Sequence, residues 1–169
     1  MQFRDLQIED VAKLLAFELA NRAWFEKTVE GRHEAFYTTE GVAAHIRECL
    51  DGYACGILHP LVILDADGDI AGRANLRFID PAAGCCEIGY RIAEPHCGKG
   101  WASASVRYMQ QLAYGTWRLA FLQAYASIEN PASARVLEKN GFVRQELVRE
   151  RSLVQGRRLD SYRYRHVPA

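Results

Sequence analysis

The chain has 169 residues, with 21 Lys and Arg against 21 Asp and Glu. This length predicts one domain that can bury a core without disulfides or metal ions. The balanced charge argues against a protein that binds nucleic acid or anionic membranes through its net charge. Five irregularly spaced cysteines, with no visible signal peptide or membrane-spanning run, lead us to expect a cytoplasmic protein with reduced thiols.

Hydrophobic periodicity predicts strands mixed with amphipathic helices, because apolar residues alternate in some segments and recur every three or four residues in others. The predicted strands cover residues 3–6, 61–64, 70–79, 87–92, 119–126, 142–153 and 159–166. The predicted helices cover residues 8–22, 40–52, 101–113 and 131–140, with Thr39 as the cap of the second. No repeat or linker interrupts this pattern, which favours one mixed α/β sheet.

Residues 23–39 combine aromatic and charged side chains without a clear period, which is typical of a loop or a broken helix. Trp24, Phe25 and Phe36 could bind a substrate there, since binding residues are common on such connections. They could equally be core aromatics that anchor the segment.

Residues 85–114 are expected to form a strand, a glycine-containing loop and a helix. Pro95 ends the strand, and Gly98 and Gly100 permit backbone conformations and close ligand approach that other side chains would prevent. The first turn of the following helix would present free N–H groups to an anion, most commonly phosphate. The spacing lacks the third glycine of the dinucleotide fingerprint and the Gly-Lys-Ser/Thr of the nucleotide P-loop, so the glycines alone could equally belong to a plain strand-to-helix loop that needs them for its turn.

A second motif runs from Glu129 to Phe142, with the sequence ENPASARVLEKNGF. Asn130 suits the N-cap of a helix and Pro131 its first position. Gly141 suits the left-handed residue that ends it.

Together, the Gly-Lys-Gly loop before a helix and the Asn-Pro-Ala-Ser motif with its Leu-Glu-Lys-x-Gly-Phe ending resemble the GNAT superfamily of acyl-coenzyme A N-acyltransferases. The tail VQGRRLDSY, residues 154–162, is similar to the RimJ/RimL branch, which acetylates protein N-termini and small amines. The resemblance covers nearly the whole chain. It implies a single α/β (α+β) GNAT-type domain over residues 1–169, with a mixed, mostly antiparallel sheet of about seven strands and about four flanking helices.

The resemblance also implies which residues bind acetyl-CoA, the acyl donor. Backbone N–H groups from Gly98 to Ser103 would hold the pyrophosphate, with Lys99 beside it, and Asn130 would contact the pantetheine arm. The full set expected at the donor site is Ile88, Tyr90, Ile92, Cys97, Gly98, Lys99, Gly100, Trp101, Ala102, Ser103, Asn130 and Ser133. Cys97 departs from the family, which commonly has Gln or Arg there, but the backbone cradle does not need that side chain.

Acyl transfer to an amine needs a group that removes a proton, a donor for the oxyanion and an acid for the leaving thiolate. Glu87 matches an acidic strand residue of the family that acts as a base, directly or through water, although it could instead pair with arginine or face solvent. Ser133 matches the proposed general acid, or it contributes only to the start of the helix. Tyr125 is a further catalytic candidate, and a backbone N–H near Gly89 or Tyr90 would bind the oxyanion.

The leading interpretation is an acetyl-CoA-dependent N-acetyltransferase, a monomer or homodimer. Its acceptor could be a protein N-terminus, an amino acid, a polyamine-like metabolite or an antibiotic amine. The alternative is a regulatory module of the same fold that binds acyl-CoA without turnover.

Two further readings are less favoured. Seven arginines lie between residues 144 and 165, but strand geometry would spread them over both faces, so we expect no nucleic-acid partner. Cys85, Cys86, His96 and Cys97 match no usual zinc spacing, and adjacent strand residues point to opposite faces, so we expect no metal.

Overall fold

The computed structural model describes residues 1–168. Its strands are β1 (Gln2–Asp5), β2 (Leu58–Leu64), β3 (Ile70–Asp80), β4 (Cys85–Ile92), β5 (Phe121–Ser127), β6 (Val143–Val154) and β7 (Arg157–His166). Its α-helices are α1 (Val11–Ala20), α2 (Arg22–Phe25), α3 (Thr39–Ala54), α4 (Trp101–Gln111) and α5 (Pro131–Lys139). Short 3₁₀ turns occupy Ile8–Asp10, Glu34–Phe36 and Glu94–His96, and a π-helical turn at Leu112–Thr116 follows α4.

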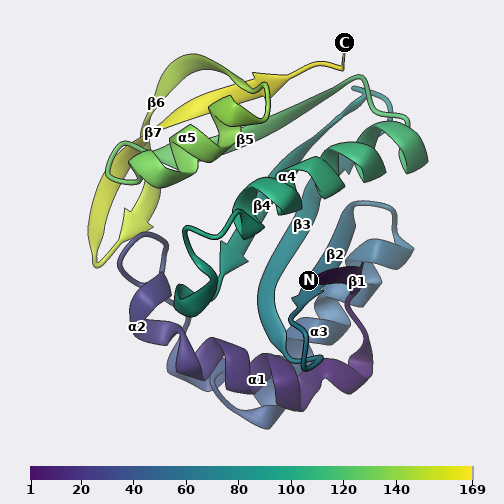
Figure 1. Ribbon diagram of the computed structural model, residues 1–169, viewed down its shortest axis with the longest axis vertical. Helices are drawn as coiled ribbons and strands as arrows, with labels where there is room; N and C mark the ends of the chain where they lie inside the picture. The colour runs from purple at the N-terminus through teal and green to yellow at the C-terminus, as the bar shows by residue number, and fades with distance from the viewer. Residues whose placement is uncertain (169) are drawn as a thin grey trace.

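The strands form one sheet in the order β1-β2-β3-β4-β5-β7-β6. Every neighbouring pair is antiparallel except β4 and β5, which are parallel and are connected through α4. Figure 1 shows these two strands separating as they leave the end where they pair. The seven strands and the mixed sheet confirm the predicted fold class, and α2 brings the helices in residues 1–168 to five.

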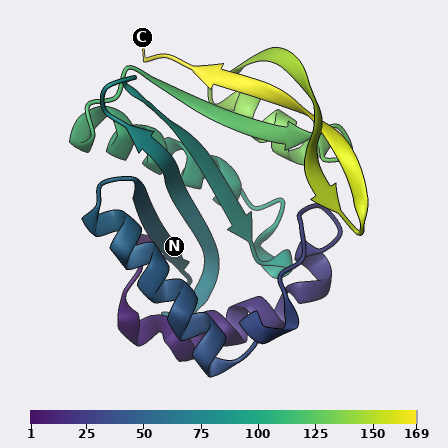
Figure 2. The same ribbon diagram turned by 180° about the vertical axis from the view of Figure 1, so that it is seen from behind.

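Two cores cover the two faces of the sheet (Figures 1 and 2). On one face, α4 and α5 pack through fully buried side chains such as Val106, Met109 and Leu137. On the other face, α1 and α3 bury Leu14 and Ile46 against β2. Alternate residues of each strand therefore belong to different cores, as the period of two requires.

The predicted helix at residues 8–22 is divided into two, because Asn21 stops α1. The Asn21 side chain donates to the carbonyl of Phe17 at 2.9 Å and accepts from the backbone N–H of Glu94 at 3.0 Å. This residue therefore ties the end of α1 to the segment that leads into the Gly98–Gly100 loop.

The predicted cap of α3 is wrong by one residue. Thr38, rather than Thr39, has the extended conformation of an N-cap, and its Oγ1 accepts from the N–H of Gly41 at 3.0 Å. A threonine at either position satisfies the sequence preference, so only the backbone geometry distinguishes them.

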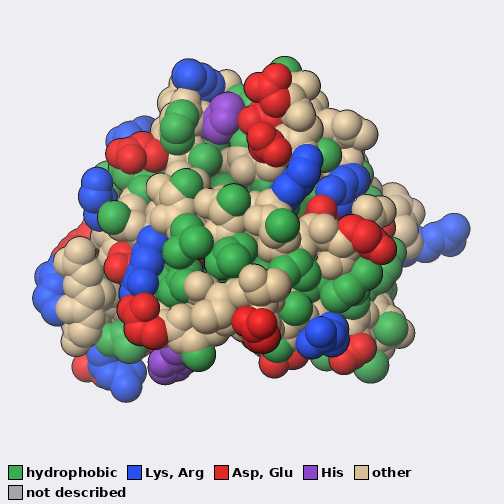
Figure 3. All heavy atoms as spheres, turned by 90° about the horizontal axis from the view of Figure 1, so that it is seen from below, with side chains coloured by type: hydrophobic (Ala, Val, Ile, Leu, Met, Phe, Trp, Pro, Cys, Tyr) green, Lys and Arg blue, Asp and Glu red, His purple; other side chains and the backbone are tan. Residues whose placement is uncertain are grey.

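Positive and negative side chains are interspersed on the face shown in Figure 3. Within residues 1–168, no helix is both long and apolar enough to cross a bilayer.

Candidate active site

The separation of β4 and β5 is the main irregularity of the sheet. They pair through only three residue pairs, Cys85–Phe121, Cys86–Leu122 and Glu87–Gln123. Beyond these pairs, β4 continues along β3 and β5 continues along β7. Past Glu87, the edges of β4 and β5 that face each other thus have no strand partner in the described chain. Their backbone N–H and C=O groups are available to hydrogen-bond a ligand.

The loop between β4 and α4 opens near this divergence. Gly98 and Gly100 have φ angles of 73° and 83°, in the left-handed region that favours glycine. A Cβ built on either residue would meet no described atom within 4 Å, so the backbone faces open space. Gly100 is the N-cap of α4 and provides no side-chain cap, which leaves the N–H groups of the first turn available to an anion.

The side chains around this loop are mostly engaged in the protein itself. Cys97 donates from Sγ to the carbonyl of Ala93 at 3.5 Å, and partial burial raises the pKa of its thiol. The Trp101 ring packs against His96 at a centroid distance of 4.3 Å. Ser103 Oγ accepts from Asn140 Nδ2 at 2.9 Å, in the contact between α4 and α5. Only the backbone of Ser103 is therefore free for the donor, while Lys99 is exposed.

On the α4 side of the sheet, β4 and α5 are joined by two hydroxyl groups. Tyr90 Oη lies 3.1 Å from Ser133 Oγ. Burial raises the pKa of the Tyr90 hydroxyl, which stays protonated at neutral pH. Asn130 is confirmed as the N-cap of α5, since its Oδ1 accepts from the N–H of Ser133 at 3.1 Å. The Ser133 hydroxyl lies beside the divergence of the strands, and its side chain is not used by the cap.

On the opposite side, Glu87 is held by two arginines. Arg77 of β3 donates to Glu87 Oε1, and Arg151 of β6 donates to Oε2 at 3.2 Å. The Arg151 guanidinium also lies over the Tyr125 ring, 4.5 Å from its centroid. The structure therefore brings Glu87 and Tyr125 together around Arg151, and it places Ser133 on the other face.

The side chains of several other predicted site residues are buried in the two cores of the protein. Ile88 and Ile92 are 3 % and 6 % exposed within the α4 core, and Ala102 packs against it. Phe25 is also buried, 5.4 Å from the Phe17 ring, and Trp24 packs on the core formed with α1 and α3.

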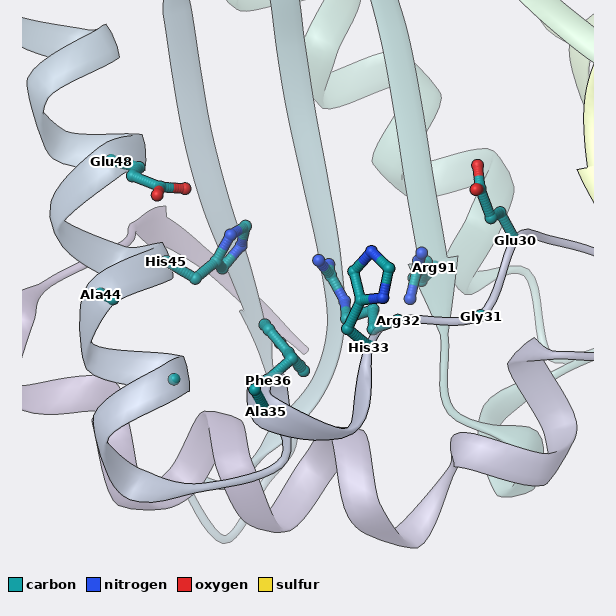
Figure 4. Close-up of a pocket in the computed structure, with 11 residues that line it drawn as sticks. Glu30, Gly31, Arg32, His33, Ala35, Phe36, Ala44, His45, Glu48 and Arg91 are labelled. Atoms are coloured by element: carbon teal, nitrogen blue, oxygen red, sulfur yellow. The ribbon is translucent and has the colours of Figure 1, made fainter.

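Phe36 lines a cavity of about 530 Å³ between the Glu30–Phe36 segment and α3. Figure 4 shows Arg32, His33 and Arg91 between the side chains of Glu48 and Glu30 in this cavity.

A charged cluster that the sequence did not predict includes two of the arginines that line this cavity, Arg32 and Arg91. Glu18 is fully buried, and its carboxylate lies 3.6 Å from Arg32, 3.8 Å from Arg73 and 3.4 Å from Arg91. Glu18 follows Leu14 by four residues on the apolar stripe of α1. A charged residue in that position was the one signal that could have revealed the cluster.

The cysteines do not gather into a metal site. Within residues 1–168, no three His, Cys, Asp or Glu side chains are close enough to hold an ion. Cys86 is buried, and burial raises its thiol pKa to about 12, whereas Cys85 is partly exposed.

Comparison with known proteins relates the chain to acetyltransferases. Residues 1–143 match the family model described as an acetyltransferase (GNAT) domain. "Probable N-acetyltransferase YjcK" of Bacillus subtilis is 29% identical over 155 residues, which are 90% of this chain and 86% of that protein.

Two solved structures share the fold across 98% of the chain. The ribosomal-protein-S5-alanine acetyltransferase of Vibrio fischeri has a TM-score of 0.93, 20% identity and 92% of its own chain covered. RimL, a ribosomal L7/L12 α-N-protein acetyltransferase in complex with coenzyme A, has a TM-score of 0.88, also 20% identity and 92% coverage. The expected likeness to RimJ/RimL enzymes is confirmed at the level of the fold.

Proposed function

We propose an activity for this protein from the premise that the chain belongs to the GNAT acetyltransferase family, whose model matches residues 1–143. Members of this family take an acetyl group from acetyl-CoA and transfer it to an amine. For this chain we propose direct transfer to a primary amine in a ternary complex, the acceptor being a protein N-terminus or a small molecule. The observation that carries the proposal is the divergence of β4 and β5 next to the open N-terminal loop of α4.

The donor site fits coenzyme A on the geometry of this loop. Gly98 and Gly100 hold their left-handed conformations with open space where a Cβ would stand, which is what a phosphate requires to approach the backbone. The N–H groups from Gly98 to Ser103 would bind the pyrophosphate. When bound, the donor supplies an activated acetyl thioester between the separated edges of β4 and β5.

Glu87 is proposed to remove the proton from the acceptor amine, directly or through water. An N-terminal α-amine has a pKa of ~8 and a lysine amine a pKa of ~10.4. A weaker base is therefore sufficient to deprotonate an α-amine. A backbone N–H on the free edge of β4, at Gly89 or Tyr90, would donate to the carbonyl oxygen as negative charge develops there.

Ser133 is proposed to donate a proton to the departing thiolate, with Tyr90 as its partner. The 3.1 Å contact between the two hydroxyls fixes the Ser133 side chain relative to β4. Because burial keeps the Tyr90 hydroxyl protonated, it can donate to Ser133 Oγ when Ser133 gives up its proton.

A second candidate function is a module that binds acyl-CoA and does not catalyse transfer. One observation favours it: both oxygens of Glu87 are already occupied by Arg77 and Arg151. Each oxygen keeps a free lone pair, but an acceptor amine would have to share the carboxylate with both arginines.

The two functions are separated by measuring acetyl-CoA binding and thiol release on the same sample. Calorimetry records donor binding, and a thiol reagent then records turnover against amino acids, polyamines and N-terminal peptides. We expect binding, with thiol release for at least one acceptor class. Binding with no release from the whole panel would favour the non-catalytic module, and absence of binding would overturn the proposal.

A further inference from the structure

Two partly exposed arginines of the cavity between the Glu30–Phe36 segment and α3, Arg32 and Arg91, belong to a charged cluster that extends into the protein. Three arginines, Arg32, Arg73 and Arg91, surround the single carboxylate of Glu18. The side chains of Arg73 and Glu18 are 4% and 1% exposed, so water does little to screen them. Within this cluster of three arginines and one carboxylate, the positive charges exceed the negative by two.

His45 adds no positive charge to this cluster, because its imidazole is neutral. Arg73 Nη1 can only donate, and it lies 2.8 Å from His45 Nε2, which must therefore be the acceptor. Burial and the neighbouring arginines lower the pKa of His45 to about 3. The nearest acids other than Glu18 are Glu30 and Glu48, which are exposed on either side of the cavity (Figure 4).

The arginines also have unused hydrogen-bonding capacity. In the described chain, Arg32 Nε and Arg73 Nε are buried without a hydrogen-bond partner, and so is Oε1 of Glu18 between these arginines. Burial is the main cause that lowers the pKa of Arg91, to about 10, and repulsion from Arg32 and Arg73 adds to it. Arg91 remains charged at neutral pH, and an anion beside Arg32 and Arg91 would offset this repulsion.

The cavity adjoins the proposed site of transfer along β4. Arg91 and Gly89 are two residues apart, so their side-chain positions share one face of the strand, roughly 7 Å from each other. Gly89 lies on the free edge of β4, past the last residue paired with β5. A ligand with one end at Arg91 would need only a few bonds to span this distance, and it would pass the Arg77 guanidinium, which lies 3.2 Å from a Cβ built on Gly89.

We propose that Arg32 and Arg91 bind an anionic group of the acceptor, a carboxylate, so that the substrate is an amine with an acidic group a few bonds from the reacting nitrogen. This inference rests on the proposed acetyltransferase function and specifies its acceptor. Amino acids and peptides with an acidic side chain near the N-terminus share the required chemistry. Polyamines, which carry only positive charge, would be repelled from the same arginines.

The direct test uses succinate as a probe that cannot be acetylated. Its binding is measured by calorimetry with coenzyme A present at saturation, so that the phosphate loop is filled. We expect succinate to bind the wild-type protein and to bind at least tenfold more weakly to Arg32→Gln and Arg91→Gln. Arg47→Gln removes an exposed arginine of α3 that does not line the cavity, and it should bind succinate like the wild type.

Turnover gives the second arm of the test. The α-amides of aspartate and glutamate are compared with those of asparagine and glutamine, so that the side-chain carboxylate is the only acidic group, and an N-terminal Ala-Asp peptide amide is compared with its Ala-Asn counterpart. We expect at least a tenfold higher kcat/KM for the acidic member of whichever pair is acetylated, and Arg32→Gln should remove that preference.

Two outcomes would overturn the inference: succinate that does not bind, or binding that is equal in the wild type and in Arg32→Gln. Arg32 lies on a surface segment and its side chain is 24% exposed, so this variant remains informative if Arg91→Gln does not fold. A protein that binds coenzyme A but not succinate would disprove only the anionic acceptor. A protein that does not bind coenzyme A would disprove the acetyltransferase itself, and succinate would then be titrated alone.

Discussion

Glu87 is the proposed catalytic base, and it also forms two ion pairs that join strands of the sheet. The residue is 9% exposed, and its carboxylate bridges Arg77 of β3 and Arg151 of β6. The Arg151 contact joins the two halves of the sheet on the acceptor side. This geometry fits a residue that only stabilises the sheet, and it also fits a catalytic base. A catalytic role predicts a loss of kcat on substitution, whereas a structural role predicts only a loss of stability.

Substitution of Glu87 by Gln is expected to lower kcat at neutral pH by at least ~10²-fold and to flatten the rise of rate with pH, because general bases contribute about that much. Affinity for acetyl-CoA should be kept. The matched variant is Arg151→Gln, which breaks the same bridge from the other side. Equal pH–rate profiles for the wild type and Glu87→Gln, with equal loss of stability in both variants, would make Glu87 structural.

Ser133→Ala tests the proposed acid without disturbing the helix cap, since Asn130 bonds to the backbone of Ser133 and not to its hydroxyl. We expect kcat to fall by ~10²-fold or more with little change in thermal stability. Asn130→Ala is the comparison, because loss of an N-cap costs about 1 kcal/mol of stability. A Ser133→Ala variant with wild-type kcat would remove Ser133 from the mechanism.

At the scale of elements, α3 presents a histidine whose titration is linked to folding. His45 faces Arg73, Cys49 and the Phe36 ring, and Arg32 and Arg91 also repel its protonated form. Its pKa is lowered from 6.5 to about 3, so between these values the unfolded chain binds a proton that the folded chain does not. Stability therefore rises with pH across this range.

We accordingly expect the free energy of unfolding to decrease as the pH falls from 6.5 toward 3, and to decrease less steeply in His45→Gln. Urea denaturation of both proteins at a series of pH values measures the difference. Parallel curves for the two proteins would show that His45 does not contribute.

The sequence predicted the sheet and its helices well, because hydrophobic period is a local property. It also placed the Gly98–Gly100 loop and the Asn130 cap, whose backbone requirements are visible in residue type. The sequence did not predict the tertiary arrangement, because Glu18, Arg73 and Arg91 come from α1, β3 and β4, and Arg32 comes from a loop. Each alone reads as a surface charge, so the cluster appears only when the chain folds.

The whole molecule consists of two sheet halves, β1-β2-β3-β4 and β5-β7-β6, joined by only three residue pairs. Side-chain contacts cross between the halves on each face: Arg151 donates to Glu87 on one, and Ser133 lies against Tyr90 on the other. The donor loop and the cationic cavity lie on either side of β4. This arrangement lets a donor and an acceptor approach the same free strand edge from opposite faces.

The most direct test of this account is calorimetric titration of coenzyme A into the wild type, Gly100→Val and Gly156→Val. Both glycines have left-handed φ angles, 83° and 73°, with open space around them, but Gly156 lies in the turn between β6 and β7. The variants should therefore suffer similar backbone strain. We expect one-to-one binding to the wild type and Gly156→Val, and binding at least about tenfold weaker, or ~1.4 kcal/mol, to Gly100→Val. Equal affinity in all three proteins would contradict a donor site at the start of α4.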